Sequence, residues 1–487
     1  MSNSIVEMQG YTLSKEIHAK KVSCVEVMDA YLNHIDKINP EVNAIVTLQD
    51  RDGLMAQAKE KDEQLAAGKD NGWMHGMPQA IKDLAATKGI RTTSGSPILK
   101  DFVPDDDILV VKQMKDAGSI IIGKTNTPEF GYGSQTYNPV FGATGNAYDP
   151  SKTSGGSSGG AGCSLALRML PVADGSDYMG SLRNPAGWNN IYSCRPSVGT
   201  VPITGPNIFI DTMATLGPMG RTVADVALLL ATQSGQTDVA PLSRADNPRI
   251  KELTPENVID KLKKDVKGTK IAWMGDWGGH LAMEKGVLET CEKTLGDALP
   301  QIGASFEKVD PFYDPKVFWE EIWLPIRHYS ACALAPFYND PEKRKLLKPE
   351  AQFEFEGSVN MSAMDVYTAF LKRGMFYLEM LKVYENYDFI AVPSAQVFPF
   401  DKNINWPDEI EGRKMSTYHN WMEVVTHWTM GSNVIVTVPA GFGGADNLPM
   451  GIQLVAKPGC EFEILQFAKA YEEATGFVDQ YRPALLD

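Results

Sequence analysis

Residues 153–162 read Thr-Ser-Gly-Gly-Ser-Ser-Gly-Gly-Ala-Gly, and five of these ten residues are glycine. A Gly/Ser tract of this kind is often a flexible linker. Here, however, an apolar segment around Leu165 follows at once, and its pattern predicts a helix. Because glycine permits close backbone approach and backbone conformations that other residues avoid, the stretch indicates a tightly packed loop at the start of a helix.

The same stretch contains a Gly-x-Ser-x-Gly pattern, Gly156 to Gly160, centred on Ser158. In α/β-hydrolases this pattern forms a sharp turn that carries a nucleophilic serine, and the turn requires an apolar strand immediately before it. Residues 149–154, Asp-Pro-Ser-Lys-Thr-Ser, are too polar for a buried strand. The sequence therefore disfavours a nucleophile at Ser158 and leaves it as an alternative.

A second glycine-containing stretch, residues 175–185, reads Gly-Ser-Asp-Tyr-Met-Gly-Ser-Leu-Arg-Asn-Pro. Ser181 follows Gly180 in a turn, and we expect a brief strand at 171–173 before that turn. The Ser181 hydroxyl and several backbone N–H groups could face one cavity, where such N–H groups stabilise the oxyanion of a tetrahedral intermediate. We expect Asp177 and Arg183 to hold the turn by an ion pair. Taken alone, the turn is also compatible with a purely structural role.

Lys82 stands near the end of residues 76–83, Gly-Met-Pro-Gln-Ala-Ile-Lys-Asp. The short apolar run before it would carry the lysine into the interior, where lysines are almost never found without a partner. A surface lysine beside Asp83 is the alternative. A buried lysine can act as a base, but its pKa, ordinarily about 10.4, must fall by several units.

Together these stretches resemble the motifs of the amidase signature family, in the order in which that family has them. Residues 76–83 resemble its lysine motif, residues 123–130 its GKTN loop, residues 155–160 its Gly/Ser hallmark and residues 175–185 its nucleophile loop. Residues 387–393, 437–441 and 448–453 resemble later segments of the family. The resemblance therefore spans nearly the whole chain.

The resemblance implies an amidase with a Ser-Ser-Lys triad that contains no histidine. The two catalytic serines of the family lie 24 residues apart, as Ser157 and Ser181 do here. By this resemblance Ser181 is the nucleophile that forms an acyl-enzyme, Ser157 relays protons and follows a cis peptide bond, and neutral Lys82 is the terminal base. We expect no metal and no organic cofactor.

The resemblance also implies an oxyanion hole made of the N–H groups of Tyr178, Met179, Gly180 and Ser181. The family usually has a small residue and two glycines before the nucleophile, so the side chains of Tyr178 and Met179 are a departure that we expect to reshape the pocket or its packing. By alignment of the GKTN loop, Gly131 and Tyr132 would bind substrate on the acyl side, together with Ser157.

A further departure lies at Arg195, where the family often has lysine. We expect this change to be structural.

The 487 residues are 43% hydrophobic and 22% charged, an ordinary globular composition without a linker or repeat. We therefore expect a single domain, residues 1–487. Alternating apolar runs and helical patterns predict an α/β fold with a central mixed β-sheet covered by helices on both faces. The expected helices lie at 23–38, 108–117, 224–231 and 461–473, and the expected strands at 119–122, 270–274, 388–392, 434–438 and 450–455.

Residues 312–386 differ from the rest because they are helical, aromatic and charged. Phe318, Trp319, Trp323 and Tyr329 lie close together there. We expect this segment to form a lid or a variable wall of the substrate pocket, or simply to pack on the sheet.

The net charge of −15, with no dense Lys/Arg stripe, makes nucleic acid an unexpected direct partner. The first residues lack the features of a signal peptide, and no stretch approaches the roughly 18 apolar residues of a membrane span. The six cysteines are scattered and contain no CxxC pair, which is typical of a reducing compartment. We expect a cytoplasmic protein that does not bind membranes and that could form a homodimer.

Other chemistries have weaker support. The seven histidines form no HExxH motif and no cluster with zinc-ligand spacing. A Ser-His-Asp triad stays open because its members can be distant in the chain, and nothing around Cys332 indicates an activated thiol.

Within the family, two alternatives stay open. One is the glutaminase-type subunit of an aminoacyl-tRNA amidotransferase, which the departure at Tyr178 and Met179 disfavours. The other is a catalytically inactive binding protein, which the retention of all three triad residues disfavours. We expect a free-standing amidase for a small or aryl-substituted carboxamide, and the aromatic residues at 319–329 motivate the aryl group.

Overall fold

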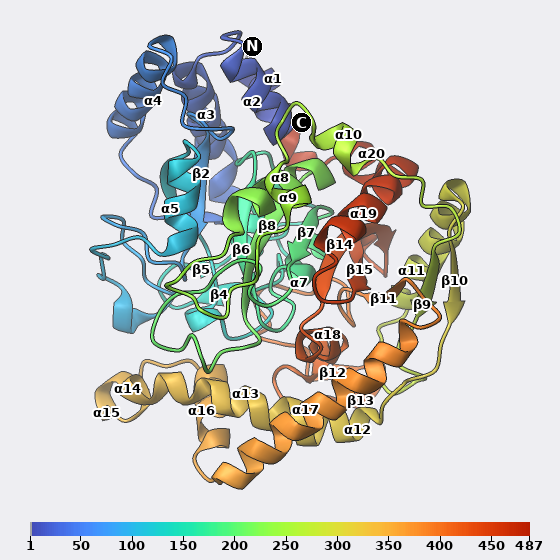
Figure 1. Cartoon of the computed structure of the whole chain (residues 1–487). Coiled ribbons are helices and arrows are strands. Elements are labelled where there is room, and N and C mark those ends of the chain that lie inside the picture. Colours follow the sequence, from blue (N-terminus) through green and yellow to red (C-terminus); the bar gives the residue numbers. More distant parts are fainter. Residues whose placement is uncertain (1) are drawn as a thin grey trace.

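The computed structural model describes residues 2–487 and contains a large sheet of eight strands (Figure 1). The strand order is β10-β9-β11-β15-β14-β7-β8-β6. Strand β9 is parallel to β10 and β11, and the remaining pairs are antiparallel, so the sheet is mixed, as predicted. The strands are β6 (Ala173–Asp177), β7 (Tyr192–Arg195), β8 (Thr215–Gly220), β9 (Lys270–Trp273), β10 (Ser305–Lys308), β11 (Phe389–Pro393), β14 (Val434–Gly443) and β15 (Leu448–Ala456).

Helices cover both faces of this sheet. Val392 pairs with Gln453, so their side chains share one face, and there Gln453 accepts a hydrogen bond from Arg183 of α7 (Arg183–Trp188). Phe389 lies three residues before Val392 and therefore on the other face, where its ring contacts Phe467 of α19 (Glu461–Thr475). The prediction of a sheet covered on both faces is confirmed.

A smaller sheet carries the lysine motif. It has the order β1-β3-β2, with β1 (Ile45–Val46), β3 (Ile120–Thr125) and β2 (Pro78–Lys82), and every residue of β2 is buried. The backbone N–H of Lys82 donates to a carboxylate oxygen of Asp174 at 3.2 Å, which ties the end of β2 to β6 of the large sheet. The two sheets therefore meet where Lys82 emerges.

Most of the expected elements are present. The helix expected at 23–38 is α3 (Cys24–Val42), which begins at a capping box of Ser23 and Glu26 and ends where Asn43 adopts a left-handed φ of 53°. The helices expected at 108–117 and 224–231 are α5 (Leu109–Asp116) and α8 (Val223–Gln233). The brief strand expected at 171–173 was misplaced, because β6 begins at Ala173 and runs on to Asp177.

The segment 312–386 is helical, as expected, and Figure 1 shows its helices along the lower edge of the molecule. A π-helical turn, Trp319–Trp323, joins the first two of them. The helices are α12 (Pro315–Phe318), α13 (Leu324–Ser330), α14 (Ala335–Tyr338), α15 (Pro341–Arg344), α16 (Pro349–Ser358) and α17 (Ala363–Val383).

The remaining elements lie around these layers. They are α1 (Ser2–Glu7), α2 (Gly10–His18), α4 (Arg51–Ala66), α6 (Gly159–Ala166), α9 (Pro248–Lys251), α10 (Val258–Leu262), α11 (Val287–Ala298), α18 (Thr426–Met430), α20 (Phe477–Gln480) and the short strands β4 (Tyr137–Asn138), β5 (Gly142–Ala143), β12 (Glu409–Ile410) and β13 (Arg413–Lys414). Among the helices of residues 2–487, none combines the length and the apolar character needed to cross a bilayer.

Candidate active site

Lys82, the last residue of β2, is buried, with 1% of its surface exposed. Its side-chain nitrogen Nζ lies 2.7 Å from Oγ of Ser157, 2.8 Å from Oγ of Ser158 and 2.9 Å from Oγ of Ser176. These three hydroxyls match the three protons of an ammonium group. The lysine is therefore buried as expected, and the surface-lysine alternative is wrong.

Burial lowers the pKa of Lys82 to about 7, although the carboxylates of Asp174 and Asp177 act in the opposite direction. Desolvation disfavours the charged form of a lysine, and the three hydroxyls around it carry no compensating charge. At neutral pH a substantial fraction of Lys82 is therefore the neutral amine, which can accept a proton.

Ser157 lies in the glycine-rich loop, and the peptide bond between Gly156 and Ser157 is cis. A Cβ atom on Gly156 would lie 2.7 Å from the backbone nitrogen of Gln135, so only glycine fits there. The N–H of Gly156 donates to Oδ1 of Asn184 at 3.0 Å. The loop is thus tightly packed, and the linker alternative is wrong.

Ser158 directly precedes α6 and accepts a hydrogen bond from Lys82. It is fully buried, and it is absent from the residues that line the neighbouring cavity. The residues before it form no strand. The structure therefore lacks the strand-turn-helix arrangement that a nucleophile at Ser158 requires.

Ser181 lies in the turn between β6 and α7, after Gly180, whose φ is 80°. Asp177 organises this turn by accepting hydrogen bonds from the N–H groups of Gly180 at 3.1 Å and Leu182 at 3.0 Å. The expected ion pair is confirmed, because Asp177 also lies 2.7 Å from a guanidinium nitrogen of Arg183.

Two arginines stabilise the charge of Asp177. Burial works against the carboxylate, but Arg183 and then Arg195 hold its pKa at about 2. Arg195 also donates to the backbone carbonyls of Met213 and Asn433, so the departure at this position has a structural role, as expected.

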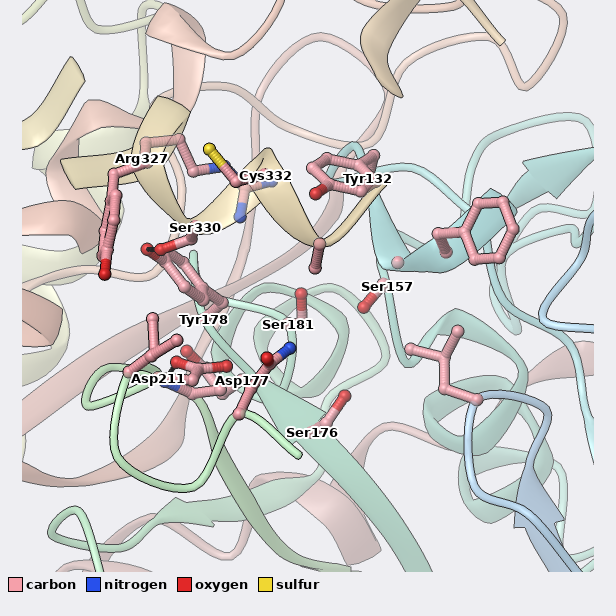
Figure 2. A pocket seen from close by; sticks show the side chains of 18 residues that line it. Tyr132, Ser157, Ser176, Asp177, Tyr178, Ser181, Asp211, Arg327, Ser330 and Cys332 are labelled. Atoms are coloured by element: carbon pink, nitrogen blue, oxygen red, sulfur yellow. Dashed lines mark hydrogen bonds between the residues drawn. The ribbon is translucent and has the colours of Figure 1, made fainter. Parts of the chain in front are cut away.

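The hydroxyls of Ser157 and Ser181 point into the same cavity (Figure 2). Within the described chain no hydrogen bond joins the two hydroxyls, but the N–H of Ser158 donates to the carbonyl of Ser181 at 3.2 Å and fixes the two loops together. The structure therefore places Ser157 beside Lys82 and brings Ser157 and Ser181 to the same cavity.

The four N–H groups expected in the oxyanion hole are not equivalent. The N–H of Gly180 is occupied by Asp177. No hydrogen bond involves the N–H groups of Tyr178, Met179 or Ser181 in the described chain. These three N–H groups, and not that of Gly180, are free to bind an oxyanion.

The cavity has a volume of about 440 Å³. Gly131 and Tyr132 line it, as the family alignment implied, and a Cβ on Gly131 would lie 3.6 Å from Oγ of Ser157. Its other lining residues are Leu84, Phe130, Ser157, Ser176, Asp177, Tyr178, Ser181, Asn207, Ile210, Asp211, Ala214, Arg327, Tyr329, Ser330, Cys332 and Ala333.

Arg327 of α13 faces the serines across this cavity (Figure 2). Its guanidinium carbon lies 4.7 Å from the ring centre of Tyr132 and 4.6 Å from that of Tyr178, so it is stacked between the two rings. Its Nε donates to Glu354 at 3.0 Å, and Glu354 also binds His328 and Tyr418. Burial opposes the charge of Glu354, but Arg327 and His328 hold its pKa well below the usual range.

Sequence reasoning missed two residues of this site. Ser176 lies five residues before Ser181, in the same motif. Its place in that motif is the signal that could have identified it. Arg327 had no such signal, since it is one basic residue on a helix. Of the aromatic group at 318–329 only Tyr329 lines the cavity, whereas Trp319 and Trp323 stack on each other in the core.

Comparisons with known proteins show the family to which the chain belongs. Residues 26–465 match the family model described as amidase. An acylamidase of Rhodococcus erythropolis is 31% identical over 476 residues, which cover 97% of this chain and 96% of that protein. A glutamyl-tRNA(Gln) amidotransferase subunit of Carboxydothermus hydrogenoformans is 32% identical over 504 residues, covering 97% of this chain and 98% of that protein.

Among solved structures, a bacterial aryl acylamidase of the amidase signature family superposes with a TM-score of 0.88 over 98% of each chain, at 24% identity. At that identity the likeness shows the fold. Taken with the relatives, it defines a hydrolase that acts on carbon–nitrogen amide bonds. The chain belongs to the amidase signature family, and the resemblance expected from its motifs is confirmed.

Proposed function

We propose that the chain hydrolyses a small, aryl-substituted carboxamide through an acyl-enzyme on Ser181. The observation that carries this proposal is the position of Lys82. Its Nζ is 2.7 Å from Oγ of Ser157, its pKa is lowered to about 7, and Ser157 shares a cavity with Ser181. A base that is partly neutral at physiological pH is what a serine nucleophile needs.

The proton moves along these residues. Neutral Lys82 takes the proton of Ser157, Ser157 takes that of Ser181, and Oγ of Ser181 forms a bond to the amide carbonyl carbon. When the carbon–nitrogen bond breaks, the protonated lysine returns the proton through Ser157 to the leaving nitrogen. Water then attacks the acyl-enzyme ester on Ser181 while Ser157 and Lys82 accept its proton. This step releases the carboxylic acid and restores Ser181.

The developing oxyanion lies at the turn before α7. We assign its stabilisation to the N–H groups of Tyr178, Met179 and Ser181, because the N–H of Gly180 is committed to Asp177. Asp177 thus positions the turn, and the side chains of Tyr178 and Met179 leave the backbone donors free.

The proposal of an aryl substituent is based on the residues that line the cavity. Phe130, Tyr132, Tyr178 and Tyr329 line it, and its volume of about 440 Å³ lies in the range of small-molecule sites. An aromatic ring can pack between these side chains, and Arg327 offers hydrogen-bond donors to an acceptor at the far end of the substrate. The names of the relatives, acylamidase and aryl acylamidase, support the same class of substrate.

A second candidate is a glutaminase that works together with a partner protein. The relative from Carboxydothermus hydrogenoformans supports it, and the cavity holds both a cation, Arg327, and an anion, Asp211, which could meet the two charges of glutamine. However, Glu354 already neutralises Arg327. The site therefore favours a substrate without a free carboxylate.

The test compares three substrates of the purified chain: an acetanilide, acetamide and L-glutamine. We expect the value of kcat/KM for the anilide to exceed that for acetamide by at least about tenfold, in line with the binding energy of one buried ring, and no cleavage of glutamine. A higher kcat/KM for acetamide than for the anilide would contradict the proposal that the substrate carries an aryl group. Preferential cleavage of glutamine would establish the second candidate, and no turnover of any amide would support the inactive binding protein.

A further inference from the structure

Helix α17 (Ala363–Val383) has an apolar face that nothing in the described chain covers. Its members are successive large side chains spaced three or four residues apart, so they lie on one side of the helix. They are Met364 (65% exposed), Tyr367 (62%), Leu371 (55%), Met375 (55%) and Leu378 (62%). Figure 1 shows α17 at the lower outer edge of the molecule.

The opposite side of α17 packs into the core. Ala369, Phe376, Met380 and Val383 are buried there, and the ring centre of Phe376 lies 4.8 Å from that of Phe318. A helix that is apolar on both sides is normally buried on both sides. Exposed apolar patches of this extent mark association sites.

Gly374 adds a notch to the same face. It follows Leu371 by three residues and precedes Leu378 by four, and a Cβ atom on it would meet nothing within 4 Å. Glycine weakens the interior of a helix, and no contact within residues 2–487 requires it here. The face therefore combines a knob, Leu371, with a hole of matching position, Gly374.

We propose that a second copy of this chain covers the face, with the two α17 helices antiparallel. A two-fold axis between Lys372 and Arg373 would place Leu371 over the partner's Gly374 and Tyr367 against the partner's Leu378. Each contact then occurs twice, as an isologous interface requires. The insertion of Leu371 into the gap at Gly374 has the form of knobs-into-holes packing.

Charge disfavours a membrane surface as the occupant. Lys372 is already paired with Glu321 of its own chain, and Lys382 with Glu379. A membrane-surface helix would instead need unpaired basic residues along its flanks, and the chain carries a net charge of −15.

The area is sufficient for a specific dimer. Covering five side chains that are 55–65% exposed would remove on the order of 1,000 Å² from the two copies together, near the lower bound for specific interfaces. Contacts between the two copies around the edge of this face would add to the buried area. We expect a reversible dimer, and the arrangement does not depend on the substrate proposed above.

The decisive variant is Gly374→Leu, which fills the notch and whose Cβ would meet no atom of the described chain within 4 Å. Gly296→Leu is the matched control, because Gly296 is an exposed glycine inside α11 and a Cβ on it also meets nothing within 4 Å. In sedimentation equilibrium we expect dimers for the wild type and for Gly296→Leu. Gly374→Leu should raise the dissociation constant by at least about tenfold, as loss of a central contact does. It should not lower the thermal melting temperature, because leucine is a better helix former than glycine.

The orientation is tested by cross-linking in a Cys332→Ser background, since Cys332 is exposed. A mixture of Tyr367→Cys and Leu378→Cys chains should form a disulfide-linked dimer, whereas either chain alone should not. A wild type that stays monomeric at all concentrations would overturn the proposal, as would a dimer that survives Gly374→Leu unchanged. Binding of the wild type to lipid vesicles that is lost in Leu371→Glu would assign the face to a membrane instead.

Discussion

The side-chain nitrogen of Lys82 lies 2.7 Å from the hydroxyl oxygen of Ser157, and both residues are almost completely buried. This contact joins two segments that lie 75 residues apart in the chain. The contact depends on β2, which places Lys82 in the interior. It also depends on the loop before Ser157, where the close packing of the backbone admits only glycine.

The first prediction concerns pH. Lys82 is charged below its pKa of about 7 and neutral above it, and only the neutral form can accept a proton. The value of kcat/KM should therefore rise through about pH 7 with the slope of one proton and level off above it. Asp174 raises the pKa of Lys82, so Asp174→Asn should move this rise to lower pH. An activity that falls between pH 6 and 8 would contradict a lysine base.

The second prediction separates the two adjacent serines. Ser157 and Ser158 each make one hydrogen bond to Lys82, at 2.7 and 2.8 Å, but only Ser157 lines the cavity. Steady-state kinetics should show a loss of kcat/KM of roughly 10³-fold in Ser157→Ala, as for loss of a proton-transfer group. Ser158→Ala should lose less than about tenfold, as for one hydrogen bond. Equal losses would mean that the relay does not run through Ser157.

The third prediction concerns the turn that holds Ser181. Asp177→Asn leaves Arg183 and Arg195 buried without their counter-charge, so the free energy of unfolding should fall by about 3–5 kcal/mol. Because the pKa of Asp177 is about 2, below its ordinary value, its contribution is present above about pH 4 and is lost as the pH falls toward 2. Denaturant unfolding measures this loss.

The control for that change is Asp260→Asn, which breaks an exposed ion pair with Lys263. It should alter the free energy of unfolding by less than about 0.5 kcal/mol. If both variants behaved alike, the network around Asp177 would not hold the turn.

The fourth prediction concerns substrate binding. Arg327→Lys keeps a positive charge near Glu354 but loses the flat stack between Tyr132 and Tyr178. We expect KM for an anilide to rise by roughly tenfold, as for loss of one stacked contact, while kcat changes little. Arg249→Lys is the matched control, since Arg249 stacks on Phe462 at the surface, and it should leave KM unchanged. An unchanged KM in Arg327→Lys would place the substrate elsewhere in the cavity.

Much of the site was predictable because its chemistry is local in the chain. The loops around Ser157 and Ser181 need glycines at fixed places, and those glycines are visible in the sequence. The strands β9, β11, β14 and β15 were predictable because each contains a run of mostly apolar residues. By contrast, β8 (Thr215–Gly220) contains two glycines and a proline, so its pairing with β6 and β7 comes from tertiary contacts and leaves no local pattern.

The pocket walls were harder to predict. The aromatic group at 318–329 suggested a wall, yet Trp319 and Trp323 turn into the core, because the spacing of residues on a helix does not say which side meets the cavity. Arg327 is found only once the fold brings Tyr132 and Tyr178 to either side of it. The prediction that residues 312–386 vary with the substrate stays a prediction.

The most direct test of the central claim is labelling with a fluorophosphonate, followed by peptide mapping of the adduct. The account predicts an adduct on Ser181 that forms in the wild type and in Ser158→Ala and is lost in Lys82→Ala. An adduct on Ser158, or an adduct on Ser181 that forms as fast in Lys82→Ala as in the wild type, would contradict the relay from Lys82 through Ser157 to Ser181.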